Sequence, residues 1–234
     1  MADYYSHLTV LNSAATLHPS DPAFKVPQIN VLTGESYWQS ITYSEFHNDV
    51  ARVARYWSRI LTAAGITRRA TIGLWYVDNH SSPPKSNTNV VFRLGGMRYQ
   101  DVLHIYGISR AGYVPQLFSL GLTSPIVISE LLRKANARAL IFDPSFECAL
   151  GDIHLSSHVA VDPQCIHDSA TTLLESPRIV NGDETAFVFH TSGSTSGSPK
   201  LVSCSHRWLN AIVKKAKQIC TPRDPRRQDV TVWM

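Results

Sequence analysis

Residues 185–200 read TAFVFHTSGSTSGSPK, an apolar run followed at once by a loop rich in glycine and hydroxyl groups. The run predicts a strand. Gly193 and Gly197 accept backbone angles that are closed to other residues and let the chain approach a ligand closely. Successive backbone N–H groups in such a loop can form a concave anion site, to which Lys200 adds a positive charge. The stretch therefore predicts a loop that binds the phosphates of a nucleotide.

The candidate binding residues offer hydroxyl, backbone amide or ammonium groups to those phosphates. They are Thr191, Ser192, Gly193, Ser194, Thr195, Ser196, Gly197 and Lys200. A flexible Ser/Gly linker is the plain alternative, but a linker need not lie between a buried strand and an amphipathic helix or end in Pro-Lys. The Walker-type pattern GxxxxGK[ST] does not fit, because Ser198 stands where its second glycine is required.

Hydrophobic patterning organises the rest of the chain. It predicts helices over residues 44–64, 98–111, 124–137 and 205–220, and strands over residues 70–75, 113–118, 139–142, 159–161 and 185–189. Strands that alternate with helices indicate an α/β fold in which helices cover a parallel sheet. Ligands in such sheets bind beyond the carboxyl ends of the strands, where the 190–200 loop is expected.

Two further expectations concern the ends of the chain. Residues 1–40 are predicted to form an extended N-terminal segment. The helix over 205–220 is predicted to bury an apolar face. That face comprises Trp208, Leu209, Ile212, Val213, Ala216 and Ile219.

Composition narrows the class of protein. The 234 residues are 44% hydrophobic and only 17% charged, with a net charge of +4, which argues against a disordered or nucleic-acid-coating chain. The basic cluster near the end is expected to be a solvated helix face and tail; it comprises Lys214, Lys215, Lys217, Arg223, Arg226 and Arg227. No apolar stretch is long enough to span a membrane, and the first residues do not resemble a secretory signal. A cytoplasmic setting is the default expectation.

Metal and acid–base candidates are few. Cys148, Cys165, Cys204 and Cys220 form no C-x-x-C or His/Cys pair, so no zinc site is predicted. His190 flanks the loop and either approaches a phosphate or simply ends the strand. His206 is expected to be structural, and Asp143 and Asp162 are expected to end strands.

The loop resembles the phosphate-binding signature T-S-G-[ST]-T-G-x-P-K of the adenylate-forming superfamily, which contains acyl-CoA synthetases, luciferases and the adenylation domains of nonribosomal peptide synthetases. The matching residues are Thr191, Ser192, Gly193, Ser194, Thr195, Pro199 and Lys200. This chain departs from the signature by one extra residue, Ser196, which lengthens the spacing between Thr195 and Pro199-Lys200 by one. The pair Ser205-His206 matches the T/S-H pair that opens the family's next helix.

Two weaker motifs occur in the expected order. Residues 41–46, ITYSEF, resemble L-T-Y-x-E-L, and residues 110–115, RAGYVP, resemble a shortened K-A-G-x-x-x-V-P. The resemblance covers about residues 22–215. The residues of these motifs are most similar to those of the adenylation domains of fungal carboxylic acid reductases related to aminoadipate reductase.

The resemblance implies ATP- and Mg²⁺-dependent activation of a carboxylic acid to an acyl-adenylate. The acyl group would then pass to the thiol of coenzyme A or phosphopantetheine, with carrier and reductase domains downstream. The family's G-x-T-E and T-G-D motifs do not occur, so residues 41–234 are expected to be an incomplete N-terminal part of an adenylation domain. No catalytic residue is assigned, and residues 76–93 are expected to be an insertion.

Two alternatives to an enzyme portion stay open at this point. One is a nucleotide-binding module or pseudoenzyme that performs no chemistry. The other is a truncated product without function. ATP–pyrophosphate exchange separates the enzyme from both.

Overall fold

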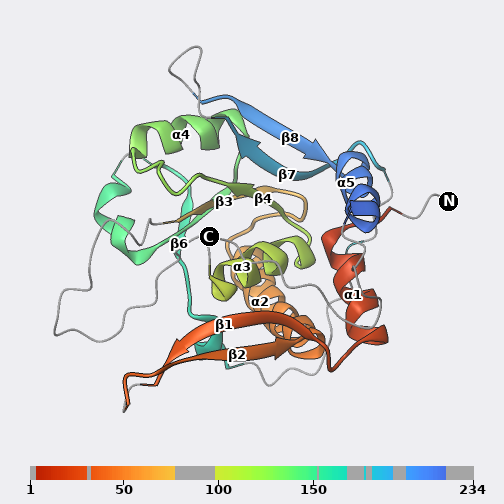
Figure 1. The fold of residues 1–234 in the computed structure, drawn as a ribbon. Coiled ribbons are helices and arrows are strands. Elements are labelled where there is room, and N and C mark those ends of the chain that lie inside the picture. Colours follow the sequence, from red (N-terminus) through yellow and green to blue (C-terminus); the bar gives the residue numbers. More distant parts are fainter. Residues whose placement is uncertain are drawn as a thin grey trace.

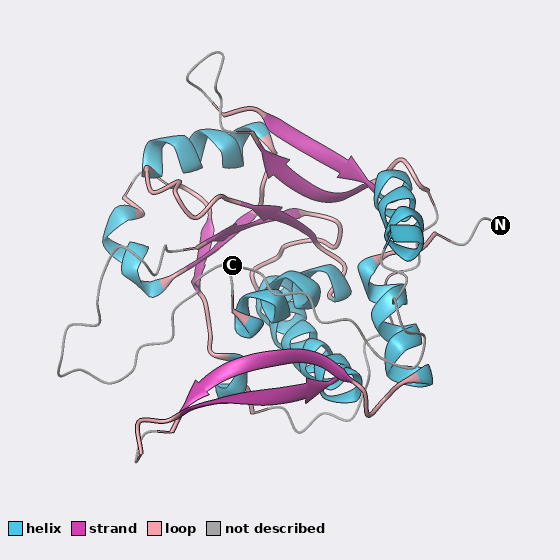
Figure 2. Ribbon diagram, viewed as in Figure 1, coloured by secondary structure: helices cyan, strands magenta, loops and turns pink. Residues whose placement is uncertain are grey.

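The computed structural model describes residues 4–30, 33–76, 98–151, 153–167, 177, 181–191 and 199–219. Within these residues a six-stranded sheet forms the centre of the molecule, and helices cover it (Figures 1 and 2). The expected insertion at 76–93 falls outside the described residues except for Tyr76.

The central sheet has the strand order β6-β5-β3-β4-β7-β8. Its strands are β3 (Thr71–Trp75), β4 (Val114–Leu117), β5 (Ala139–Phe142), β6 (Ser156–Val159), β7 (Thr185–His190) and β8 (Leu201–Ser205). The pairings from β6 through β7 are all parallel, which confirms the predicted helix-covered parallel sheet. The edge strand β8 pairs antiparallel with β7 and was not predicted.

Alternate residues of the inner strands face two separate cores, as the two-residue repeat of a strand requires. Ile72 and Leu74 of β3 belong to the core shared with α2 (Tyr43–Ala63) and α3 (Tyr99–Arg110). Leu140 and Phe142 of β5 belong to the opposite core, which contains α4 (Pro125–Lys134). Both faces of the sheet are therefore covered.

Helix α2 shows why the sequence folds in this way. The Thr42 hydroxyl accepts the Glu45 backbone N–H at 3.2 Å, and the Glu45 carboxylate accepts the Thr42 N–H at 2.7 Å, which is a capping box. The helix ends before Gly65, whose φ of 74° is readily adopted only by glycine. Between these signals one face of α2 is buried, and the helix matches the range predicted over residues 44–64 within one residue at each end.

The N-terminal region differs from its prediction. Residues 1–40 contain α1 (His7–Leu17), β1 (Pro22–Ile29) and the first part of β2 (Ser36–Thr42), so an extended segment is wrong for α1. A capping box between Ser6 and Thr9 starts α1. The helix buries only Leu8 and Leu11, which left little periodic signal. The division of the chain at residue 40 stays a prediction, although β2 crosses that point.

The short elements refine the remaining expectations. Asp143 follows β5 and caps the 3-10 helix η2 (Pro144–Ala149), and Asp162 caps η3 (Pro163–Cys165). Both aspartates therefore have structural roles after the strands, as expected. Helix α4 ends at Lys134 rather than near Ala137.

Helix α5 (His206–Ile219) corrects another prediction, because none of its residues is buried. Trp208 is 46% exposed, Ile212 44% and Ile219 70%. The helix follows the edge strand β8 and lies beside α1 (Figure 1). Of its apolar face, Leu209 is half-buried against the small core of Ala186, Phe187 and Cys204.

Candidate functional site

The predicted phosphate loop is the closed end of an antiparallel hairpin. His190 of β7 pairs with Leu201 of β8. One step further, the Thr191 N–H donates to the Lys200 carbonyl at 2.9 Å, and the Lys200 N–H donates to the Thr191 hydroxyl at 3.4 Å. Thr191 and Lys200 are therefore brought together at the base of the loop.

The middle of the loop, residues 192–198, lies outside the described residues. The candidates in this part are Ser192, Gly193, Ser194, Thr195, Ser196 and Gly197. Their contact with phosphate stays a prediction.

The position of the loop agrees with the expectation for a parallel sheet. Strands β3, β4, β5 and β7 run in the same direction, so their carboxyl ends meet at one edge. The loop leaves the carboxyl end of β7 at that edge, which is where ligands of open α/β sheets bind.

Lys200 is exposed, and its ammonium has no ion-pair partner among the residues that the structure describes. A lysine ammonium is a compact, flexible cation with three donors. Lys200 is thus available to an anion bound at the loop.

His190 has its two ring nitrogens engaged by the main chain. Nε2 lies 2.8 Å from the Ser119 backbone nitrogen, which donates to it, and Nδ1 lies 3.2 Å from the Thr191 carbonyl oxygen. Of the two roles left open for His190, these contacts support the strand-end role over direct contact with phosphate. Sequence reasoning missed Ser119, because nothing in a sequence links residues 71 positions apart.

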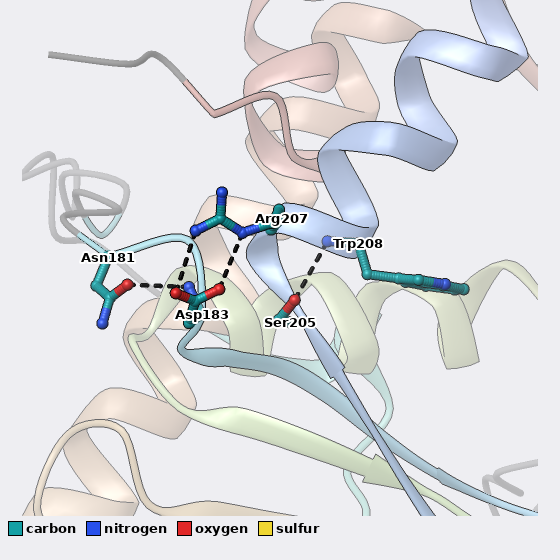
Figure 3. Close-up of polar contacts among 5 residues, drawn as sticks. All are labelled: Asn181, Asp183, Ser205, Arg207 and Trp208. Atoms are coloured by element: carbon teal, nitrogen blue, oxygen red, sulfur yellow. Dashed lines mark hydrogen bonds and ion pairs between the residues drawn. The ribbon is translucent and has the colours of Figure 1, made fainter.

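The start of α5 lies at the other end of β7 (Figure 1), and Figure 3 shows the polar contacts there. The Ser205 hydroxyl accepts the Trp208 N–H at 3.2 Å, as a helix cap does. The His206 N–H donates to the Glu184 carbonyl at 3.0 Å, and the Arg207 N–H donates to the Gly182 carbonyl at 2.7 Å. Three backbone donors of this helix start are therefore satisfied by the chain itself.

A bidentate ion pair supports the same turn (Figure 3). Arg207 Nε and Nη2 lie 2.9 and 3.1 Å from the two Asp183 carboxylate oxygens. The pair lowers the pKa of Asp183 and raises the pKa of Arg207. Burial lowers the pKa of His206, consistent with its expected structural role. The predicted Ser-His pair does open α5, but β8 separates it from the loop.

A cavity of about 320 Å³ also lies at the amino ends of β3, β4 and β7. Its lining includes His7, Arg69, Glu184 and His206 but no candidate residue of the loop. The cavity is therefore separate from the predicted nucleotide site.

Within the described ranges, no group of three His, Cys, Asp or Glu residues could hold a metal ion. Cys148, Cys165 and Cys204 are free thiols. None of the helices in the described part of the chain is sufficiently long and apolar to cross a membrane.

Comparison with known proteins gives one curated relative and many related folds. The AMP-binding domain-containing enzyme iboA of Amanita muscaria (strain Koide BX008) is 30% identical over 216 residues, which are 89% of this chain and 38% of that protein. No model of a protein family matches the chain.

Solved structures share the fold at lower identity. The o-succinylbenzoate CoA synthetase of Bacillus subtilis, in complex with ATP and magnesium ion, superposes with a TM-score of 0.62 at 18% identity over 93% of this chain and 48% of that chain. The nonribosomal peptide synthetase FmoA3, bound to AMPPNP, gives 0.62 at 16% identity over 94% of this chain and 19% of that one.

The iboA relative and the shared fold support the resemblance to the adenylate-forming superfamily, over part of the length of these proteins. The chain spans about two fifths of the curated relative that it matches. The fold is that of the N-terminal subdomains of these enzymes.

Proposed function

We propose that the 190–200 loop binds the phosphates of MgATP and that the chain is the nucleotide-binding portion of an enzyme that activates a carboxylic acid. One observation carries this proposal: the loop closes a hairpin at the carboxyl edge of the parallel sheet, with the exposed residue Lys200 at its base. The ATP- and AMPPNP-bound proteins of the same fold support the choice of nucleotide.

The reaction requires little covalent chemistry from the protein. A carboxylate oxygen attacks the α-phosphorus of ATP, and the bond from that phosphorus to the bridging oxygen breaks, giving an acyl-adenylate and pyrophosphate. Fixed donors near the developing negative charge lower the barrier to such a transfer. Lys200 and the loop amides would hold the departing phosphates, and Mg²⁺ would enter with ATP and share their charge.

The finer assignment rests on the motifs. The acyl group would pass to a coenzyme A or phosphopantetheine thiol, and the chain would belong with carboxylic acid reductases whose carrier and reductase domains lie downstream. A cytoplasmic location would supply the ATP. A nucleotide-binding module without chemistry is the second candidate, because the motif residues assigned here serve binding alone.

Substitution of Lys200 tests the proposal. We expect Lys200→Ala to weaken ATP affinity at least about tenfold, as loss of a charged hydrogen bond would. Lys214→Ala, which removes an equal charge from exposed α5, is the control and should bind as the unsubstituted chain does. Isothermal titration calorimetry with MgATP measures both. Equal affinities in the two variants would contradict the phosphate role.

ATP–pyrophosphate exchange separates the enzyme from the binding module. We expect the chain, extended by the remainder of an adenylation domain, to catalyse exchange in the presence of its acid. ATP binding without exchange for any acid, in that extended protein, would favour the module.

A further inference from the structure

The carboxyl ends of β4 and β7 lie side by side. Gln116 of β4 pairs with Val188 of β7 in parallel register. Continuing that register by two residues brings Phe118 beside His190, and their ring centroids are 6.2 Å apart. The residue that follows Phe118 is Ser119, whose backbone N–H donates to His190 Nε2 at 2.8 Å.

The chain after β4 forms a turn that is hydrogen-bonded to the end of β3. The Leu122 N–H donates to the Ser119 carbonyl at 2.9 Å, and the Trp75 indole N–H donates to the Leu122 carbonyl at 2.9 Å. Trp75 is fully buried at the end of β3 and stacks on Phe146 with centroids 4.0 Å apart. The 119–122 turn is therefore fixed to the sheet on one side and to His190 on the other.

Thr191 is held at three points. Its N–H and its hydroxyl pair with the Lys200 main chain, and its carbonyl accepts from His190 Nδ1. Because residues 192–198 follow Thr191 directly in the chain, these bonds set where the chain enters the loop.

The two partners of His190 define its protonation. Nε2 accepts a hydrogen bond from an amide, so it carries no proton. Nδ1 faces a carbonyl oxygen, so it carries one. The ring is thus the neutral Nδ1–H form, with both nitrogens used by the backbone of two different segments.

We infer that His190 is a positioning residue that links the 119–122 turn to the base of the phosphate loop. Through this link, binding of a nucleotide at the loop is transmitted to the turn after β4. The inference rests on the proposed ATP binding. Both linked segments lie at the ligand-binding edge of the sheet, so the link joins the nucleotide-binding loop to a neighbouring wall of the same site.

Four variants test the link. His190→Phe keeps a planar ring beside Phe118 but removes both hydrogen bonds, and we expect ATP affinity to fall about tenfold. His190→Gln can still accept from the Ser119 N–H and should recover part of that loss. Ser119→Pro removes the donor, and Ser119→Ala keeps it. We expect the first to bind ATP more weakly and the second to bind as the unsubstituted chain does.

Nuclear magnetic resonance gives a readout that a merely structural role would not move. In the free chain at neutral pH, a long-range ¹H–¹⁵N spectrum should show His190 protonated at Nδ1 alone. Addition of MgATP should shift the Ser119 amide signal, and the shift should be lost in His190→Phe. An Nε2–H ring, or a Ser119 shift that persists without the histidine, would overturn the inference.

ATP binding by the unsubstituted chain and by His190→Phe distinguishes failure of this inference from failure of the proposed function. If the unsubstituted chain does not bind ATP, the proposed function fails, and with it the coupling. If ATP binds and depends on Lys200 but His190→Phe binds equally well, only the inference is overturned. Should His190→Phe not fold, His190→Gln and the Ser119 pair decide in the same way.

Discussion

Helices α2 and α5 carry similar sequence patterns but have different surroundings. Each shows apolar residues at three- and four-residue steps. In α2 that face is buried; its buried residues are Phe46, Val50, Ala51, Val53, Ala54, Trp57 and Leu61. In α5 no residue is buried. Periodicity therefore identifies which face of a helix is apolar, but it does not reveal whether another layer covers that face.

The difference follows from the position of each helix along the sheet. Helix α2 lies with α3 between the sheet and the β1–β2 hairpin, so its apolar face meets neighbours on several sides (Figure 1). Helix α5 follows the outermost strand β8. One tryptophan in each helix shows the contrast: Trp57 of α2 is fully buried, whereas Trp208 of α5 is 46% exposed.

The largest expected effect is loss of the α2 anchor. Trp57→Ala should lower the free energy of unfolding by about 3–5 kcal/mol, because it leaves a cavity in the core. Trp208→Ala is the matched control and should cost less than about 1 kcal/mol, since the side chain is half exposed. Urea unfolding followed by circular dichroism measures both. Similar losses in the two variants would remove the contrast between the helices.

An effect of intermediate size concerns His7 of α1, beside α5. Its ring centroid lies 4.7 Å from that of Tyr106 and 4.9 Å from that of Phe187, and both nitrogens are shielded, with no hydrogen-bond partner among the residues that the structure describes. Burial, with a smaller effect of His206, lowers its pKa to about 3. The unfolded chain then binds more protons between about pH 6.5 and pH 3, so stability falls as the pH falls through that range.

His7→Phe should remove this penalty. We expect the variant to be about 1–3 kcal/mol more stable at pH 7, because a shielded group without a partner is replaced by a ring that needs none. It should also lose less stability between pH 6.5 and pH 5. Thermal melts across that range measure both effects, and exposed His154→Asn is the control. Some acid sensitivity should remain, because burial also lowers the pKa of His104 to about 4. If the stability of His7→Phe depends on pH as strongly as that of the unsubstituted chain, the assignment of this acid sensitivity to His7 is wrong.

The sequence predicted those parts of the fold whose signal is local. The apolar runs of β3, β5 and β7 and the capped, periodic stretch of α2 were recognisable because each carries its own pattern. Strand β8, LVSCS, was missed because its five residues have little alternation and owe their conformation to pairing with β7. The α5 face was misjudged because burial depends on neighbours that a local pattern does not contain.

The candidate site divides in the same way. Lys200 and the position of the loop after a strand could be read from residue types and order. The contact between Ser119 and His190 could not, because it depends on the register between β4 and β7, which only the folded sheet defines.

The smallest expected effects compare the caps of the two helices. Thr42 and Ser205 each accept a backbone N–H of the first turn, at 3.2 Å in both cases. Loss of such a cap costs about 1 kcal/mol. In Thr42→Ala that cost should appear as a lower melting temperature with α2 still protected, because the buried face keeps the helix docked. In Ser205→Ala it should appear as faster amide exchange confined to α5, because no buried residue ties this helix to the global transition. Hydrogen exchange read by mass spectrometry separates the two cases, and equal protection of α5 before and after the change would mean that α5 is held as firmly as α2.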